Sequence, residues 1–462
     1  MLHDLARELL VAAKLVAPPP PPPPPPSMLG LSSSAIFSIV IVTLLLEYAL
    51  STISSLLNQS SLASTIPKEF EGVYDAAKYA KSQDYTRAKA RFSHVTRTFD
   101  LCLLLTFWLL FDGFERLDVW AREVVPEDRP VLQGLAYFGV FGIFVQVMAL
   151  PFEVYSTFVL EEHFGFNKTT CRTFVMDRIK SLFLTLVLAP FPLGLVIYYF
   201  SNSGPYGWFW AWSIITAFQV VLLLIAPILI MPLFLKFTEL PQGELRTAIE
   251  SYAKSVDFKA AGGIFEVDGS TRSSHSNAFF TGFGSTKRIA LFDTLIQQSN
   301  TSEIIAVLAH EVGHEKKGHV TNRLLTAIVH TFALFWVMSF FLAEPALFSA
   351  FSVSHPSVHV GLVLFGLLYE PINVFLEILM TMRSRADERE ADRYSVDTNG
   401  DAEALVSGLK KLSKNNLDNL TPHPFHVWLT YSHPPVLERI QLIRRRADEL
   451  KAMAQASKSS MH

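Results

Sequence analysis

The sequence predicts an all-α membrane protein of about seven spans with a small α+β portion outside the bilayer. Half of its 462 residues are hydrophobic, only 18% are charged, and the mean hydropathy is positive. Several apolar runs are long enough to cross a hydrocarbon core of about 30 Å, which takes about 20 helical residues. After the fifth run, short β-rich segments separated by Gly and Ser interrupt the helical pattern.

Composition argues against several other classes. The two cysteines, Cys102 and Cys171, provide neither a disulfide framework nor a cysteine metal site. The formal net charge of −3 indicates no particular partner. Since no basic patch, Gly-rich phosphate loop or aromatic-basic pattern is present, we expect no nucleic acid partner.

The N-terminal residues 1–30 read as a tail. Pro18–Pro26 is a run of nine prolines, which forms polyproline II or a tether. No small-residue cleavage site follows an apolar segment, so we do not expect a secretory signal.

Hydrophobic runs divide the rest of the chain. We expect five spans in a membrane domain at 31–234, a metallopeptidase-like region at 235–323, two spans within 324–381, a second polar region at 382–446 and a tail at 447–462. The spans are placed at Ala35–Leu57, Thr98–Phe111, Leu132–Pro151, Leu182–Phe200, Phe209–Phe234, Leu324–Leu342 and Val358–Met380.

Basic residues predict the orientation of these spans. Residues 58–97 contain seven Lys or Arg and 156–178 contain three basic residues, whereas 113–130 contain three Arg against five acids, and 201–208 and 344–357 contain no Lys or Arg. Because cytoplasmic loops carry the excess of Lys and Arg, the odd-numbered connections face the cytosol. The N-terminus then lies on the lumenal side.

Carboxylates within the predicted spans suggest a wet interior. These residues are Glu47, Asp100, Glu153, Glu370 and Glu377. Intramembrane acids usually face a bundle interior or a water-filled cavity. For Asp100 and Glu153, which lie near span ends, snorkelling to the interface is an equal alternative.

The polar region after the fifth span predicts a small sheet. Residues 243–256 form an amphipathic helix, and the runs Gly263–Val267, Asn277–Thr281 and Arg288–Phe292 read as strands. A sheet edge there could hold an extended peptide by main-chain hydrogen bonds, although a purely structural hairpin fits the spacing equally well.

Thr301–Val320 predicts a helix that carries a metal site. Asn300 and Glu303 offer a capping box at its start. His310 and His314 are four residues apart and therefore share one face. The pattern His-Glu-x-x-His on a helix is typical of a zinc site, in which Glu311 can accept a proton from water.

A hydrolytic zinc site needs a third protein ligand. His319 does not fit the long metzincin spacing, which places Lys317 and Val320 at its Gly and His positions, so we read it as an ordinary helix-end residue. Glu388 and Asp392 after the seventh span share a helix face, and one can bind zinc while the other accepts a histidine ring N–H. Glu390 points elsewhere. The alternative is a solvated helix with Arg–Glu pairs.

His310-Glu-Val-Gly-His314 together with Glu388-x-x-Ala-Asp392 resembles the M48 family of zinc peptidases, and the membrane context resembles its CAAX protease branch. The resemblance extends from the first span to about residue 446. Further stretches that carry it are Phe158–Lys168, Ile230–Phe234, Gly243–Ile249, Ser274–Gly284 and Ser432–Arg439. Glu390 departs from the family pattern, in which related chains often have a neutral residue.

The resemblance implies a set of roles. It makes His310, His314 and Glu388 the ligands of one Zn²⁺ per chain, Glu311 the general base and Asp392 a partner behind the ligands. His433 and Arg439 would hold the substrate and the oxyanion, and the strand with Asn277, Ala278 and Phe279 would pair with the substrate. The implied fold is a ring of seven helices around a large interior chamber, with the α+β zinc-peptidase portion on the cytosolic side.

The function that follows is removal of the C-terminal aaX tripeptide from prenylated CaaX proteins or peptides, with a second upstream cleavage in some members. The resemblance implies a monomer in the bilayer of the endoplasmic reticulum, with the inner nuclear membrane as a further location, and an active site that faces the cytosol. Two alternatives stay open: a membrane quality-control metalloprotease with lipid-independent substrates, and an inactive membrane scaffold or transporter.

Overall fold

A computed structural model describes residues 30–259, 262–275, 277–281 and 287–460. The polyproline tail and part of the Ser274–Gly284 stretch therefore lie outside the described residues. The helices are α2 Ser33–Ser60, α3 Ala76–Leu105, α4 Gly113–Val124, α5 Pro130–Tyr155, α6 Cys171–Leu188, α7 Pro190–Asn202, α8 Gly207–Ile225, α9 Met231–Phe234, α10 Glu244–Ser255, α11 Asp293–Gln298, α12 Thr301–Lys316, α13 His319–Leu342, α14 Pro345–Ala350, α15 Val358–Asn399, α16 Ala402–Asn415, α17 Pro424–Thr430 and α18 Val436–Ser459.

The predicted membrane architecture is confirmed. Within the described chain, six helical stretches are long and apolar enough to cross a membrane, and a seventh is reached if α3 and α4 count as one bent span. The bend between them is 65°. This segment contains the shortest predicted span, and the break after it explains why its apolar run is short.

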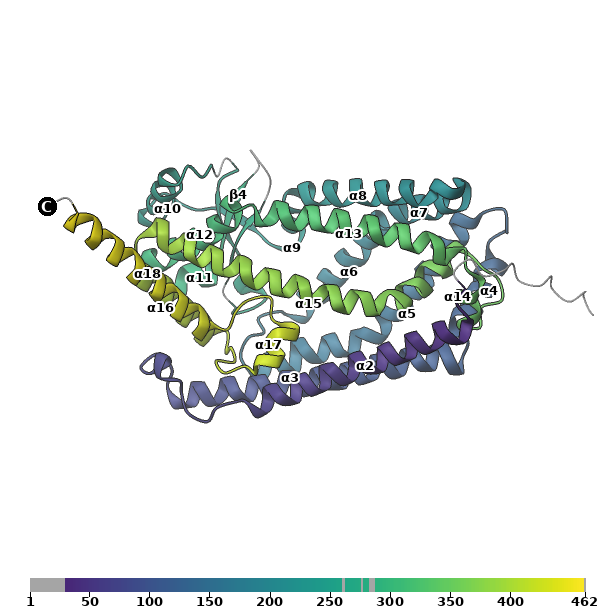
Figure 1. Ribbon diagram of the computed structural model, residues 1–462, viewed down its shortest axis with the longest axis horizontal. Helices are drawn as coiled ribbons and strands as arrows, with labels where there is room; N and C mark the ends of the chain where they lie inside the picture. The colour runs from purple at the N-terminus through teal and green to yellow at the C-terminus, as the bar shows by residue number, and fades with distance from the viewer. Residues whose placement is uncertain (1–29, 260–261, 276, 282–286, 461–462) are drawn as a thin grey trace, which may run out of the picture.

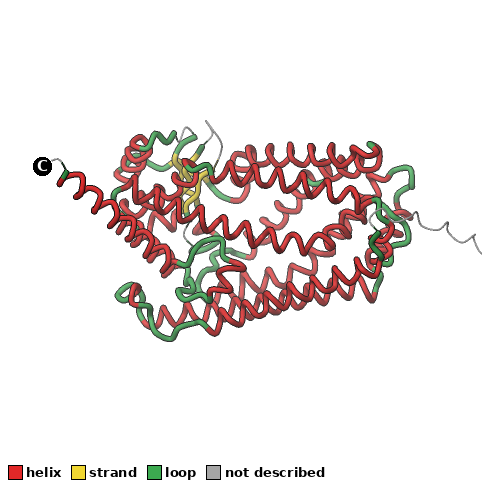
Figure 2. Tube along the Cα trace, viewed as in Figure 1, coloured by secondary structure: helices red, strands yellow, loops and turns green. Residues whose placement is uncertain are grey.

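The long helices lie side by side along the longest axis of the molecule (Figure 1). The sheet gathers at one end of this bundle, near α10 and α12, while α4 and α14 lie at the opposite end (Figure 2). The helix α18 projects away from the bundle at the end that holds the sheet. The polar elements are thus collected at one end of the spans.

The small sheet is mixed and has four strands in the order β1-β2-β4-β3. Its strands are β1 Phe237–Glu239, β2 Ile264–Val267, β3 Ala278–Thr281 and β4 Arg288–Phe292. β1 and β3 pair antiparallel with their neighbours, whereas β2 and β4 run parallel. The sequence predicts β2, β3 and β4 but not β1, because three residues are too few to show a strand pattern.

The helix predicted over Thr301–Val320 is divided in two. It ends at Lys316, and a new helix begins at His319. Gly318 adopts a left-handed conformation with φ +71°, which glycine reaches at little cost because it lacks a Cβ atom. The break turns the chain from the peripheral helix α12 into the membrane helix α13.

Candidate active site

The helix α12 places two histidines on the same face. Its capping box is formed as predicted, since the Asn300 side chain accepts from the Glu303 N–H and the Glu303 carboxylate accepts from the Asn300 N–H. Its apolar residues pack into a core with α10 and the sheet. The opposite face presents His310 and His314, whose Nε2 atoms lie 3.2 Å apart.

Small residues let α15 approach this face closely. A Cβ atom on Gly313 would lie only 3.1 Å from the Ala391 Cα atom and from the Tyr394 side chain. Ala391 is itself fully buried. Because the two helices touch at these positions, Glu388, one turn before Ala391, comes to lie against the histidines.

Three ligand-type side chains meet at this crossing. The ligand atoms of His310, His314 and Glu388 all lie within 4.8 Å of one another. Glu388 Oε1 is 3.2 Å from His314 Nε2, and Glu388 Oε2 is 3.3 Å from His310 Nε2.

These residues fit a metal ion. Glu388 Oε2 is buried and makes no hydrogen bond among the described residues, which is costly unless a cation satisfies it. Two imidazoles and one carboxylate are also the ligand set of a catalytic zinc site that keeps one position open.

Asp392 supports the first histidine from behind. Its Oδ1 atom lies 2.9 Å from His310 Nδ1, which leaves Nε2 free to bind a metal. Arg439 holds the same carboxylate with two hydrogen bonds of 2.7 and 2.8 Å. Burial alone would lower the pKa of His310, but the carboxylates of Asp392 and Glu388 raise it to about 9. The surroundings therefore favour positive charge at this point.

Glu311 is the uncommitted carboxylate of the site. It lines the cavity next to the triad, and no hydrogen bond or ion pair to it occurs among the described residues. Burial raises the pKa of this carboxyl group. Its side chain is available to a reactant in the cavity.

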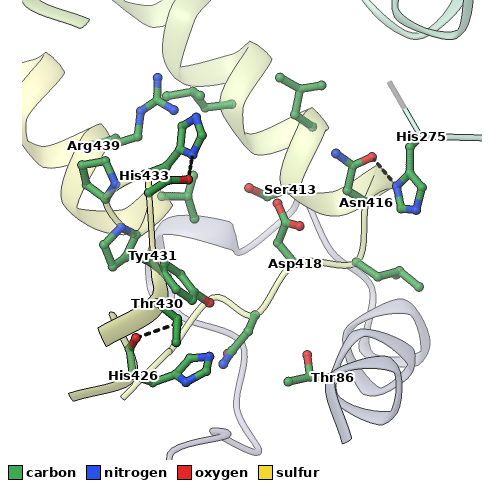
Figure 3. A pocket seen from close by; sticks show the side chains of 18 of the residues that line it. Thr86, His275, Ser413, Asn416, Asp418, His426, Thr430, Tyr431, His433 and Arg439 are labelled. Atoms are coloured by element: carbon green, nitrogen blue, oxygen red, sulfur yellow. Dashed lines mark hydrogen bonds between the residues drawn. The ribbon is translucent and has the colours of Figure 1, made fainter. Parts of the chain in front are cut away.

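A segment after α17 covers the triad from another side. His433 Nε2 lies 3.3 Å from Glu388 Oε1, and the Ser432 hydroxyl lies 2.9 Å from His433 Nδ1 (Figure 3). Arg385 of α15 holds this segment, because its guanidinium donates to the backbone carbonyls of Val427 and Tyr431. Desolvation at the cavity wall lowers the pKa of His433, because it disfavours the imidazolium form. Sequence reasoning gave no signal for Arg385.

Arg439 reaches the site as well, but mainly through Asp392. Its Nε and Nη2 atoms are committed to that carboxylate, whereas Nη1 lies 3.5 Å from Glu388 Oε2. The side chain is only 11% exposed. Only one edge of the guanidinium is therefore turned toward the cavity.

His319 was read from the sequence as an ordinary helix-end residue, yet it is buried against His314. Their Nδ1 atoms lie 2.9 Å apart, and His319 Nε2 lies 3.2 Å from Glu390 Oε2. His319 and Asp387 Oδ1 are 3.7 Å apart. The signal that could have found this contact is the short distance in sequence between His314 and His319 across a glycine-containing break.

One cavity of about 850 Å³ connects the site to the strand β3. Asn277 and Ala278 line it, together with Glu311, Glu388, His433 and Arg439. Phe279 instead packs against Phe292, with ring centroids 5.9 Å apart. In the described sheet β3 pairs with β4 alone, so its outer edge is open to an added strand.

Comparison with known proteins gives a consistent family. Residues 56–236 match the family described as CAAX prenyl protease N-terminal, five membrane helices, and residues 239–447 match peptidase family M48. A CAAX prenyl protease 1 homolog of Arabidopsis thaliana is 37% identical, over 82% of this chain and 90% of its own length. CAAX prenyl protease 1 of Saccharomyces cerevisiae is 34% identical, over 81% of this chain and 87% of its own.

The fold gives the same result. The crystal structure of S. mikatae Ste24p superposes with a TM-score of 0.82 at 33% identity, covering 88% of this chain and 98% of that one. Sequence and fold comparisons thus agree over most of the chain, and the peptidase match includes the two histidines of α12 and Glu388 of α15.

Proposed function

Because the chain belongs to the CAAX prenyl protease branch of the M48 peptidase family, we propose that it uses one zinc ion to cleave the last three residues from prenylated CaaX proteins. The observation that carries the proposal is the meeting of His310, His314 and Glu388 beside the uncommitted Glu311. A second, upstream cleavage would use the same residues.

His310, His314 and Glu388 would hold the metal through two Nε2 atoms and the carboxylate. When bound, zinc supplies a Lewis acid that polarises a peptide carbonyl and makes a water molecule more acidic. Asp392 keeps the His310 proton on Nδ1, and His319 receives the corresponding proton of His314.

Glu311 moves the proton in this scheme. Its carboxylate takes a proton from the attacking water while the oxygen forms a bond to the scissile carbonyl carbon. As the C–N bond breaks, Glu311 returns that proton to the leaving nitrogen. Two products result, a new carboxylate on the protein and a tripeptide with a free amino group.

Other residues position the peptide. The open edge of β3 at Asn277 and Ala278 lies on the same cavity and can pair with an extended backbone. His433 and the Nη1 edge of Arg439 supply donors for the oxyanion that develops on the carbonyl, a preorganised role often worth a few kcal/mol.

The same membrane architecture supports an expectation for location. The chain is a multi-pass membrane protein, and from the excess of Lys and Arg in alternate connections we expect the site to lie on the cytosolic side. Location in the endoplasmic reticulum stays a prediction from the family. Since one chain supplies every residue of the site, we expect the monomer to be sufficient for activity.

The test is cleavage of matched peptides that differ only in a farnesyl group. We expect cleavage on the carboxyl side of the farnesyl cysteine, read by mass spectrometry, with Glu311→Gln as the inactive control. Burial of the lipid contributes about 0.8 kcal/mol per CH₂-sized group, so the unprenylated peptide should show a raised KM with a less affected kcat. Equal KM values would favour the quality-control alternative, and loss of all cleavage with metal bound would contradict the proposed activity.

A further inference from the structure

The cavity extends from the triad to a wall formed by α2 and α3. On α3, Thr86, Lys89, Ser93 and Arg97 line it at spacings of three to four residues, as one helix face must. Figure 3 shows Thr86 of this wall on the side of the view opposite to His433 and Arg439. The substrate cavity therefore has a second polar wall that faces the catalytic residues.

Only one cation of this cavity lacks a carboxylate partner among the described residues. Arg439 is paired with Asp392. Lys89 lies over the Tyr85 ring and close enough to Asp418 to oppose the burial that raises the pKa of that carboxyl group to about 6. Among the described residues, Arg97 has neither a carboxylate partner nor an aromatic ring beneath its charge.

The exposed Arg97 side chain makes one hydrogen bond and no ion pair among the described residues. Its guanidinium donates to the Ser51 hydroxyl of α2. The nearby His426 accepts or donates a 2.7 Å hydrogen bond with the Ser54 hydroxyl. Burial, and then the positive charge of Arg97, lower the pKa of His426. The imidazole thus stays neutral, and the guanidinium keeps an unmatched charge.

A chain of contacts leads from the triad toward the neighbourhood of Arg97. His433 contacts Glu388, and two residues earlier Tyr431 packs against His426 with ring centroids 5.6 Å apart. Three extended residues span about 10 Å. A tripeptide that begins at the cleavage point would therefore extend from the triad along this wall of the cavity, on which Arg97 also lies.

We propose that Arg97 binds the free C-terminal carboxylate of the substrate peptide and so sets where cleavage occurs. A guanidinium forms two parallel hydrogen bonds with a carboxylate, which suits an arginine that lines the cavity and has no ion pair of its own among the described residues. This inference rests on the proposed function, because only a substrate cleaved near its end has its carboxylate inside the cavity.

The test is peptide binding to the Glu311→Gln protein, which holds the substrate without cleaving it. Two farnesylated peptides are compared that differ only in a terminal carboxylate or carboxamide. We expect the carboxylate peptide to bind about 10- to 100-fold more tightly. Adding Arg97→Gln should remove most of this difference, and Arg97→Lys should retain part of it. The carboxamide peptide should bind all three proteins equally, which checks that the cavity is intact.

Two further variants act as controls. Arg91→Gln removes a cation from the same helix that does not line the cavity, so the carboxylate preference should persist. If Lys89→Gln rather than Arg97→Gln abolishes the preference, or if Arg97→Gln keeps it in full, the assignment to Arg97 is overturned. Equal cleavage of both peptides by the parent enzyme would refute carboxylate recognition and leave the proposed function intact. Cleavage of neither peptide would refute the proposed function.

Discussion

His314 and His319 lie with their Nδ1 atoms 2.9 Å apart, so a buried histidine outside the His-Glu-x-x-His pattern supports one of the metal-binding residues. When His314 binds metal through Nε2, its Nδ1–H donates to His319. The Nε2–H of His319 is then directed to Glu390.

His319→Ala should therefore weaken metal binding by roughly 10- to 100-fold, because His314 loses the partner that orients its ring. Titration with a metal-sensitive dye measures the change. Lys317→Ala in the same break is the matched control, since this exposed side chain pairs with Glu390 rather than with His314. Unchanged affinity in the His319 variant would show that the contact has no influence on the ligand.

Glu311→Gln should retain metal and lose turnover, because the amide cannot accept a proton and Glu311 is not one of the three clustered ligands. Metal content and peptide cleavage are measured on the same sample. Substantial remaining activity would contradict the proposed role as base.

The three acids of α15 should differ in their effect on the metal. Glu388→Ala should lose most affinity, Asp392→Ala should weaken it by roughly 10- to 100-fold, and Glu390→Ala should change it least. The order follows from the histidines that each acid contacts. Glu388 contacts both His310 and His314, Asp392 contacts the Nδ1 side of His310, and Glu390 contacts His319. Equal losses for the Glu388 and Glu390 variants would rule out this ligand assignment.

Gly313→Val should destabilise the protein by about 1–3 kcal/mol and weaken metal binding, because the added side chain meets the backbone of Ala391. Thermal unfolding and metal titration give the two quantities. Gly366→Val on α15 serves as the control, since a Cβ atom there meets nothing within 4 Å. A Gly313 variant with unchanged unfolding would show that the two helices have more freedom than their contact suggests.

Orientation can be tested with protease-accessible tags in sealed vesicles. A tag in 344–357 should be protected, whereas tags in the turn at 61–66 and after residue 450 should be cut, because Lys and Arg accumulate in the connections on the cytosolic side. Protection of the tag at 61–66 would reverse the orientation. It would also expose the Asn167-Lys-Thr169 sequon to glycosylation, which the proposed orientation forbids.

Local patterns in the sequence were enough to predict the spans, the capped helix α12 and most of the sheet. Each is determined by a pattern along one segment: apolar runs for the spans, Asn300 and Glu303 for the cap, and β-rich runs separated by Gly and Ser for β2 and β4. The same local rule places His310 and His314 on one helix face, and Glu388 and Asp392 on another.

What only the tertiary structure decided is how these faces meet. The close approach at Gly313 and Ala391 brings the Glu388 face against the two histidines, and the turn at Gly318 folds His319 back onto His314. Arg97 and Arg385 acquire their surroundings from α2 and from the segment after α17, which lie far from them in sequence. Spacing along a helix determines which residues share a face, but the partner of that face depends on packing between distant segments, and no local pattern encodes it.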